Sequence, residues 1–436
     1  MKIDKRKRLL VLLLCIAMVG TALLAACSKE EEEEAEPPAP PSNALTGAIA
    51  EEGYDESASD RRVVGFVVEN TPDARPQWGM DDENYSPDIV VQGEVEGGIT
   101  RMLWLYADYK KLPEIIGPTR SARPPFIKFS KFFDAVFVHW GQSHSKDDYI
   151  GANTIFKWYK VDHINQMTLD DKEGLYGRDN TRYVNVEHRG IIYPDKLEAT
   201  MANEGIRTTP NEFTKLYFNE ITQPVSEEPA TSVTVKYSME AYEPTTWTYN
   251  EEDGMYHTSD FDNDFARENL LVLLDDTEYV TKYGYQGPGG ASAVTYCNYD
   301  LAGGKALLFS KGTVKEIEWD SDLTHLILKD PAIDVETALA ANEEAKAAAK
   351  ENAVEGEDPA PYNKYYIVMP EEEEEDAEAA EGEAAEAAET EEAAEAEEAA
   401  GEEDPYAGAY VAQNLNKGKS WIGWISKNNG GSVTYN

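Results

Sequence analysis

Charged side chains suited to chemistry gather between Gly93 and Ser143, next to apolar runs that have the length of strands. A glycine pair and a Gly-Pro step interrupt the chain between these runs. Proteins commonly place binding and catalytic groups at strand ends and in the loops that follow them. The stretch therefore predicts a site at the ends of neighbouring buried strands, built from Glu94, Glu96, Arg101, Arg120, Arg123 and His139.

Arginine is the most informative residue type here. Arg120 and Arg123 flank Ser121 in a loop, and a planar guanidinium can hold a phosphate or a carboxylate through two parallel hydrogen bonds. Glycines at neighbouring strand ends let a ligand approach the backbone closely. We therefore expect a cleft of positive potential that binds an anionic ligand. The expected ligand-binding residues are Arg75, Glu96, Gly97, Gly98, Arg101, Arg120, Ser121, Arg123 and His139.

The same arginines have a structural alternative. Glu94 or Glu96 can pair with one of them and fix strand ends to each other, because buried charges in proteins are usually paired. Ligand binding and structural pairing can coexist. The sequence leaves both roles open.

Glu96 and His139 are the candidate catalytic residues. His139 ends an apolar run just before Gly141, and a histidine near a carboxylate can act as an acid or a base. A structural histidine is the alternative. The histidines show neither paired helical spacing nor a cysteine companion, so we expect no metal and no cofactor. The chain also lacks the nucleophile-elbow, phosphate-loop and dinucleotide-binding motifs.

The charge of the chain is strongly negative and unevenly distributed. The formal net charge is −44 over 436 residues, and residues 371–404 alone contain nineteen acidic and no basic side chains. Nucleic-acid binding depends on Lys and Arg that neutralise phosphates. We therefore expect no nucleic-acid partner, and the sequence identifies no protein partner.

The first 26 residues are expected to be a signal peptide. Basic residues precede an apolar run from Leu9 to Leu24, and the run is followed by Ala25-Ala26-Cys27. This order is typical of a lipoprotein signal, so we expect Cys27 to carry the lipid, palmitate included, that anchors the protein to the membrane. An ordinary signal peptide or an uncleaved anchor is the alternative. Residues 27–60 are acidic and Pro-rich and are expected to form a solvated tether.

Five short motifs mark the first half of the chain: Glu69-Asn70-Thr71-Pro72, Ala74-Arg75-Pro76, Glu96-Gly97-Gly98-Ile99-Thr100-Arg101, Gly117-Pro118 and Arg120-Ser121-Ala122-Arg123. A chain with these motifs resembles the YerB-like family of bacterial lipoproteins. The resemblance covers an N-terminal domain and, more loosely, a C-terminal one. It implies a fold and an envelope location but no reaction, because the family is of unknown function. The chain departs from the family's Pro-His-Asn step between Arg182 and Ile192, where His188 is the available histidine.

The expected fold class is α/β (α+β). We expect a layered N-terminal domain of mixed sheet with helices over residues 61–225, and a smaller β-rich C-terminal domain over residues 226–330 and 413–436. Residues 331–412 are expected to form an Ala/Glu-rich acidic insertion that is partly helical and largely disordered, since like charges repel and no apolar stripe is present. Cys297 lies in a strand-like run and is expected to be a buried small hydrophobe.

The sequence thus predicts an extracytoplasmic lipoprotein, anchored to the cell membrane, that binds an anionic ligand or envelope polymer through an Arg-rich cleft. One alternative is an envelope hydrolase or phosphotransferase that uses Glu96 and His139. The transferase hypothesis rests on a strand, turn and arginine pattern similar to that of the LytR-CpsA-Psr transferases, although their accompanying Asp is absent here. The other alternative is a scaffold protein without a small ligand.

Replacing Cys27 with Ser tests the lipid anchor. We expect Cys27→Ser to release the protein from membranes or to leave its signal peptide uncleaved, because serine offers no thiol for the lipid. Membrane fractionation and labelling with a palmitate analogue measure both outcomes. Unchanged processing together with unchanged acyl labelling would show that Cys27 is not the lipidated residue.

Overall fold

The computed structural model describes residues 40–82, 84–241, 243–283, 293–353, 360–370 and 405–436. The expected signal peptide over residues 1–26, the lipidated Cys27 and the acidic run over residues 371–404 lie outside the described residues. Among the helices that are described, none has the length and apolar composition needed to cross a membrane.

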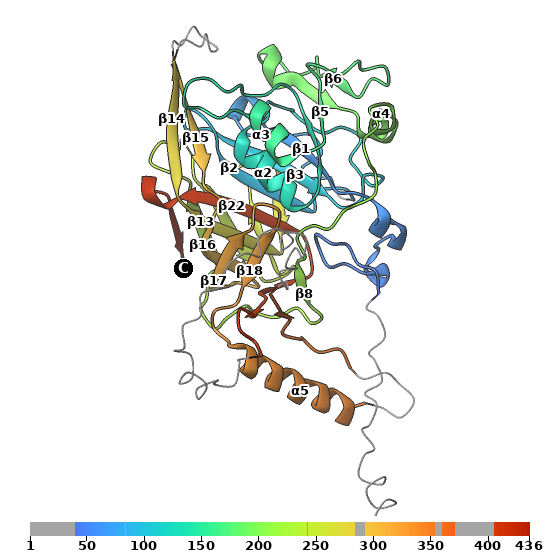
Figure 1. The fold of residues 1–436 in the computed structure, drawn as a ribbon, viewed down its shortest axis with the longest axis vertical. Coiled ribbons are helices and arrows are strands. Elements are labelled where there is room, and N and C mark those ends of the chain that lie inside the picture. Colours follow the sequence, from blue (N-terminus) through green and yellow to red (C-terminus); the bar gives the residue numbers. More distant parts are fainter. Residues whose placement is uncertain (1–39, 83, 242, 284–292, 354–359, 371–404) are drawn as a thin grey trace, which may run out of the picture. The chain divides into compact units, whose positions relative to one another are not determined.

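The central element is a ten-stranded mixed sheet (Figure 1). Many of its strands are continuous apolar runs that are buried along their whole length, as is typical of strands covered on both faces. In sheet order the strands are β18 (Leu326–Lys329), β17 (Thr313–Ser321), β16 (Gly303–Ser310), β13 (Asn269–Asp275), β22 (Ser420–Ser426), β2 (Ile89–Glu94), β3 (Thr100–Tyr106), β1 (Val64–Glu69), β4 (Val136–His139) and β5 (His163–Asn165).

Strand β22 joins the two halves of this sheet. It pairs in parallel with β2 on one side and with β13 on the other. Strands β1 to β5 come from the first part of the chain, whereas β13 and β16 to β18 follow residue 268. The sheet therefore runs without interruption across the expected domain boundary near residue 225, because a strand close to the C-terminus completes it.

Alternation along the strands divides the core into two clusters, one on each face of the sheet. In β3, Leu103 and Leu105 belong to one cluster, and Trp104 belongs to the other. The first face is covered by helices α2 (Pro124–Phe132) and α3 (Ala152–Tyr159), which contribute several aromatic side chains. The expected layered α+β architecture is confirmed.

A second sheet and helix α4 (Leu197–Asn203) contribute to the cluster on the other face. Trp247 of this sheet packs on Trp421 of β22, with ring centroids 5.4 Å apart. The second sheet has the order β12 (Phe265–Arg267), β11 (Met255–Thr258), β10 (Thr245–Asn250), β9 (Ser232–Lys236) and β23 (Ser432–Tyr435).

Smaller elements surround the two sheets. Helix α5 (Val335–Glu351) begins after its N-cap Asp334, whose side chain accepts a hydrogen bond from the backbone of Thr337, and the helix expected in this part of the insertion is thereby confirmed. The two-stranded sheets are β14 (Thr277–Tyr283) with β15 (Ala293–Tyr299), β19 (Ile367–Val368) with β20 (Tyr410–Val411), β21 (Asn414–Asn416) with β8 (Tyr217–Asn219), and β6 (Tyr176–Arg178) with β7 (Gly190–Ile192).

The tether expected over residues 27–60 is too long. Leu45 is completely buried and belongs to the core, and Ala58 is also buried. Gly47 lies against the ring of Phe218, so this segment packs on the folded body. Two short 3-10 helices, Ala50–Glu52 and Glu56–Asp60, follow. The prediction failed because a few well-placed apolar residues anchor a segment whose average composition is polar.

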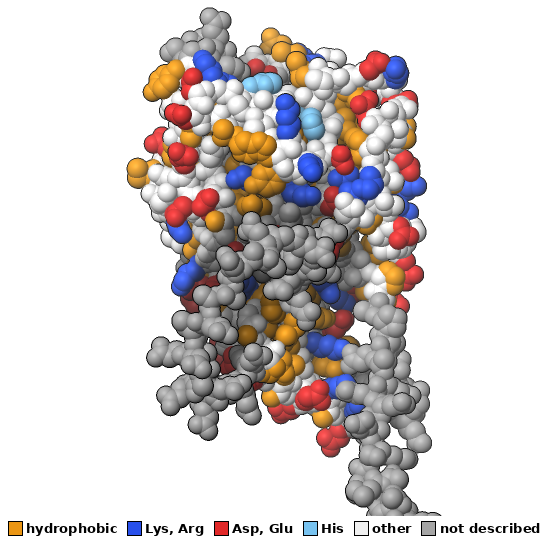
Figure 2. Space-filling view, viewed as in Figure 1, with side chains coloured by type: hydrophobic (Ala, Val, Ile, Leu, Met, Phe, Trp, Pro, Cys, Tyr) orange, Lys and Arg blue, Asp and Glu red, His pale blue; other side chains and the backbone are white. Residues whose placement is uncertain are grey.

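The surface of the described residues is mixed in charge. On the face drawn in Figure 2, Lys and Arg side chains lie among Asp and Glu side chains, and hydrophobic side chains gather over the place of α2 and α3. A charge of −44 for the whole chain therefore does not exclude a local site for an anion.

Gly93 tests the central pairing of β2 with β22. A methyl group at this position would lie 1.9 Å from Nε1 of the buried Trp424. We expect Gly93→Ala to lower the free energy of unfolding by about 1–3 kcal/mol, the usual cost of overpacking a core. Urea denaturation measures this loss.

Gly65→Ala in β1 is the matched control, because the nearest atoms to its methyl group would be flexible leucine methyls at 3.1 Å, followed by Cβ of Ala135 at 3.8 Å. Equal stability losses in the two variants would show that the contact between Gly93 and Trp424 is not tightly packed.

Candidate functional site

Glu96 is the centre of the first charged cluster. It lies in the turn between β2 and β3, where Gly97 and Gly98 have φ values of +61° and +74° that favour glycine. Its Oε2 accepts a hydrogen bond of 2.7 Å from Nε of Arg123, and its Oε1 accepts a second one from Nη2 of the same residue. Nη2 of Arg101 lies 3.5 Å from Oε1. One carboxylate thus pairs with two guanidinium groups.

Burial and charge act in opposite directions on this cluster. Burial raises the pKa of Glu96, but the positive charges of Arg123 and Arg101 outweigh it and lower the pKa to about 2. Burial and the charge of Arg123 lower the pKa of Arg101 to about 10, so Arg101 stays protonated at neutral pH. For Arg123 the charge of Glu96 overcomes burial and raises the pKa. The two-pronged pair between Glu96 and Arg123 is therefore the stronger one.

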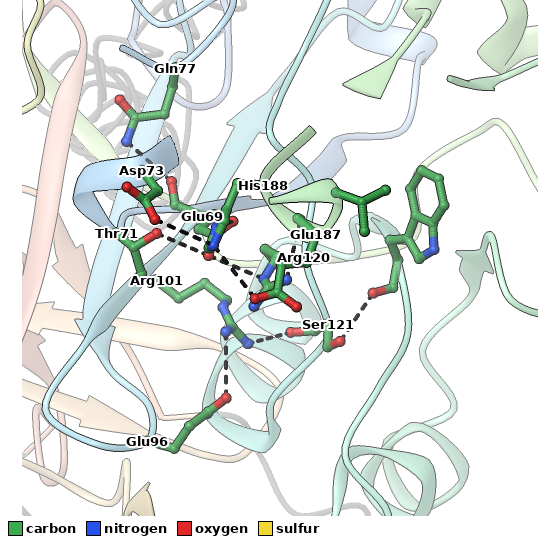
Figure 3. Close-up of polar contacts among 12 residues, drawn as sticks. Glu69, Thr71, Asp73, Gln77, Glu96, Arg101, Arg120, Ser121, Glu187 and His188 are labelled. Carbon is green, nitrogen blue, oxygen red and sulfur yellow. Dashed lines mark hydrogen bonds and ion pairs between the residues drawn. The ribbon is translucent and has the colours of Figure 1, made fainter. Parts of the chain in front are cut away.

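Glu69 is the centre of the second cluster (Figure 3). It ends β1 and is only 1% exposed. Its Oε2 lies 3.0 Å from Nδ1 of His188, and its Oε1 accepts a hydrogen bond of 3.1 Å from the hydroxyl of Thr71. Nε of Arg120 lies 3.3 Å from Oε1. Because Nε of Arg120 has no hydrogen-bond partner in the described part of the chain, this ion pair is not aligned as a hydrogen bond.

Ser121 connects the two clusters. Its backbone carbonyl accepts a hydrogen bond of 2.7 Å from Nη1 of Arg101, and the preceding residue is Arg120. Arg120 also donates from Nη1 to the carbonyl of Glu187, at 3.2 Å. Hydrogen bonds to Arg101 and to Glu187 thus fix the loop that carries Arg120 and Ser121.

A cavity of about 460 Å³ opens beside this loop, and we call it the Arg120 cavity. Arg178 contributes a second guanidinium to it, which lies over the ring of Trp140 at 4.3 Å from the centroid. Burial and the charge of Arg189 lower the pKa of Arg178. The cavity is lined by Thr119, Arg120, Ser121, Trp140, Gly141, Gln142, His144, Asn165, Met167, Thr168, Arg178, Glu187 and Gly190.

Arg75 lies in a different cavity of about 230 Å³, which we call the Arg75 cavity. Its Nη1 donates a hydrogen bond of 3.0 Å to Oε2 of Glu243. Gly98 lines the same cavity. The Arg75 and Arg120 cavities share no lining residue.

His139 is completely buried at the end of β4. Its Nδ1 lies 2.6 Å from the carbonyl of Gly141, and its Nε2 lies 2.9 Å from Nδ1 of His163. The ring of Phe156 stacks on it at 5.2 Å. Burial, followed by the nearby His163, lowers the pKa of His139 to about 3, so the ring is neutral at physiological pH. Both nitrogens are occupied by protein partners.

The structure thus brings together some of the residues expected in one cleft and separates others. Glu96, Arg101 and Arg123 form one cluster, which the backbone of Ser121 links to Arg120. Arg75 and Gly98 line the Arg75 cavity instead. Gly97 is exposed in its turn, and His139 lies within the core. Within the described ranges, no group of three His, Cys, Asp or Glu side chains is arranged to hold a metal ion.

Sequence reasoning assigned no role to Glu69, Trp140 or Arg178. Glu69 had a usable signal, because it ends an apolar strand just as Glu94 does. Arg178 had none, since it stands in a polar, glycine-containing stretch that gives no indication of its neighbours. His188, at the point where the family pattern changes, proves to be the partner of Glu69.

Comparisons with known proteins agree with this fold. Residues 45–207 match the N-terminal domain of a family described as protein of unknown function (DUF3048). The chain is 27% identical over 286 residues to "Putative lipoprotein YerB" of Bacillus subtilis (strain 168), a match that covers 63% of this chain and 76% of the relative. The crystal structure of YerB protein from Bacillus subtilis superposes with a TM-score of 0.56 at 19% identity, covering 90% of this chain and 99% of that one. The resemblance found in the sequence is confirmed.

Glu96→Gln tests the first cluster through pH. The lowered pKa of Glu96 means that its stabilising effect is present above its ordinary pKa of 4.5 and is lost as pH falls towards 2. We expect the wild type to lose about 3 kcal/mol more stability than Glu96→Gln between pH 5 and pH 2. Urea denaturation at several pH values measures the difference.

Glu94→Gln is the matched control, because Glu94 is a carboxylate of the same segment that is even less exposed than Glu96 but has a pKa raised by burial. A carboxyl with a raised pKa adds no stability on ionisation, so this variant should be as stable as the wild type at pH 7 or more stable. Parallel pH profiles for the wild type and Glu96→Gln would contradict the proposed ion pairs.

Proposed function

We propose that this chain is a lipid-anchored envelope protein that binds an anionic ligand in the Arg120 cavity. The chain is similar to the YerB-like lipoproteins of bacteria, whose biochemical function is unknown. Cys27 carries the lipid, and the folded residues stand outside the cell membrane. The similarity to a lipoprotein supports the anchor, as does the order of basic, apolar and small residues before Cys27.

The charge of Arg178 is the observation that carries the proposal: its Nη1 donates a hydrogen bond to the neutral backbone carbonyl of Val186, which does not neutralise that charge. Among the residues described, no carboxylate lies within ion-pair distance of Arg178, although its guanidinium contributes to a cavity that already contains Arg120. Burial and then the positive charge of Arg189 lower the pKa of Arg178, and Arg189 has no ion-pair partner in the described ranges either. An anion between Arg120 and Arg178 would relieve this repulsion.

The other walls of the cavity suit an anion that carries a larger group. Thr119 lines the cavity and is 2% exposed, and its buried hydroxyl has no hydrogen-bond partner in the described structure. The volume of about 460 Å³ is within the range of about 300–1,000 Å³ typical of ligand sites. A phosphate- or carboxylate-bearing unit of an envelope polymer fits this combination of charge, donors and space.

The scaffold hypothesis has its own support. Arg101 and Arg123 are paired with Glu96 and lie against buried backbone, which is the arrangement of a structural lock. We assign these two arginines to the framework and Arg120 with Arg178 to the ligand. The enzyme hypothesis lacks such support, because Glu96 is neutralised by two arginines and both nitrogens of His139 are bonded.

Arg178→Ala and Arg120→Ala test the proposal. Suitable probes are poly(glycerol phosphate) for phosphate, polygalacturonate for carboxylate and dextran as the neutral polymer, with affinity measured by calorimetry at low salt. Loss of a charge-assisted hydrogen bond costs about 1.5–3 kcal/mol, so we expect each variant to bind the preferred anionic polymer about tenfold or more weakly. For Arg178→Ala the melting temperature should change by no more than about 2 °C.

Arg182→Ala is the control with the same loss of charge, because Arg182 lies over Trp78 and donates to the carbonyls of Ala74 and Pro76, away from the cavity lining. A structural lock predicts the opposite order for Arg120→Ala, a large loss of stability with unchanged affinity. Equal weakening by Arg182→Ala would indicate nonspecific attraction.

A further inference from the structure

The Arg75 cavity has features of a second, independent site. It lies where the turn between β2 and β3 meets the start of β10. Its volume of about 230 Å³ is below the range of about 300–1,000 Å³ that drug-sized ligands occupy. The occupant must therefore be a small molecule. This cavity presents both signs of charge to its contents, through Arg75 and through the carboxylates of Glu243 and Asp260.

Arg75 is oriented before any ligand arrives. Its Nε donates to the side-chain oxygen of Asn70 at 3.3 Å, and its Nη2 donates to the Asn70 backbone carbonyl at 3.0 Å. The side chain of Arg75 is 11% exposed. Only Nη1 reaches across to Glu243. The guanidinium is thus fixed along one edge and offers its other edge to an acid, which lowers the entropic cost of binding.

The contact of Arg75 with Glu243 is easily replaced. The side chain of Glu243 is 52% exposed, and exposed ion pairs contribute little to stability. This distinguishes the pair from Glu96 with its two arginines, which is much less exposed. A ligand carboxylate can therefore take the place of Glu243 on Arg75, provided that Glu243 finds another positive charge.

The floor of the cavity is polar, neutral and rigid. Oγ1 of Thr100 accepts hydrogen bonds from the amides of Asn70, at 2.8 Å, and Gln92, at 3.1 Å. The side-chain oxygen of Gln92 accepts from Nε1 of Trp421 at 3.0 Å. These buried groups satisfy one another, so they carry no charge that competes with a ligand. Pro72, Ile99, Pro244 and Phe261 supply apolar lining.

We propose that the Arg75 cavity binds the zwitterion of a free α-amino acid, with the ligand carboxylate on Arg75 and the ligand ammonium on Glu243 and Asp260. A zwitterion inserts between Arg75 and Glu243 and leaves each of them with an opposite charge. An anion alone would lie beside the carboxylates of Glu243 and Asp260, which repel it, and a cation alone would be repelled by Arg75. The apolar lining accommodates the amino acid's side chain.

Charge-matched small molecules test this site. Alanine, as each enantiomer, carries both charges, N-acetylalanine carries only the carboxylate, and alaninamide carries only the ammonium. Calorimetry on the folded chain should detect alanine and show at least about tenfold weaker binding of the two singly charged probes, because each lacks one charge-assisted contact. Equal binding of all three probes, or no binding of any, would overturn the proposal.

Two variants in the ion pair test the two charges separately. Arg75→Ala should abolish alanine binding. Glu243→Gln should weaken alanine about tenfold but bind N-acetylalanine at least as well as the wild type does, because the competing carboxylate is removed. Asp264→Asn, an exposed carboxylate outside the cavity, is the control and should leave all affinities unchanged. If Arg75→Ala and Glu243→Gln lower only the melting temperature while alanine binding persists, the pair is a structural lock and the proposal is wrong.

Discussion

Two buried carboxylates determine what the arginines of this protein can do. Glu96 binds Arg123 and Arg101, and Glu69 contacts Arg120 and His188. A buried carboxylate without a partner is costly, so these pairs persist in the folded state. They hold the loop of residues 117–123 against the ends of β1, β2 and β3. The same pairs decide which guanidinium groups remain for ligands, because a paired and buried arginine cannot also take an anion.

The remaining cations lie at the outer side of this framework. Arg178 has no acidic partner in the described ranges and shares a cavity with Arg120, whose ion pair with Glu69 is poorly aligned. Arg75 sits in a smaller cavity and is paired only with a half-exposed glutamate. The proposed amino-acid site therefore depends on an exposed, replaceable pair, whereas the proposed anion site depends on the charge of Arg178, which no described carboxylate neutralises.

Many of the buried strands could be predicted from the sequence, whereas which strands pair and which charged residues contact each other could not. Apolar runs such as Val64–Glu69 predict buried strands because burial on both faces leaves no polar alternation, and charges at their ends predict a site. No local pattern shows that β22 pairs with β2, more than 300 residues away, or that Leu45 enters the core. Nor does the spacing in the sequence show that Glu69 contacts His188, since such contacts depend on how loops pack.

The central claim is that Arg120 and Arg178 face the ligand while Arg101 and Arg123 serve the framework. Nuclear magnetic resonance of the arginine Nε–H groups, assigned by single Arg→Lys variants, tests it during titration with the anionic polymer that binds most tightly. The account predicts that the signals of Arg120 and Arg178 shift with saturation, whereas those of Arg101 and Arg123 stay in place. Shifts confined to Arg101 and Arg123, or no shift in any of the four at saturating polymer, would contradict it.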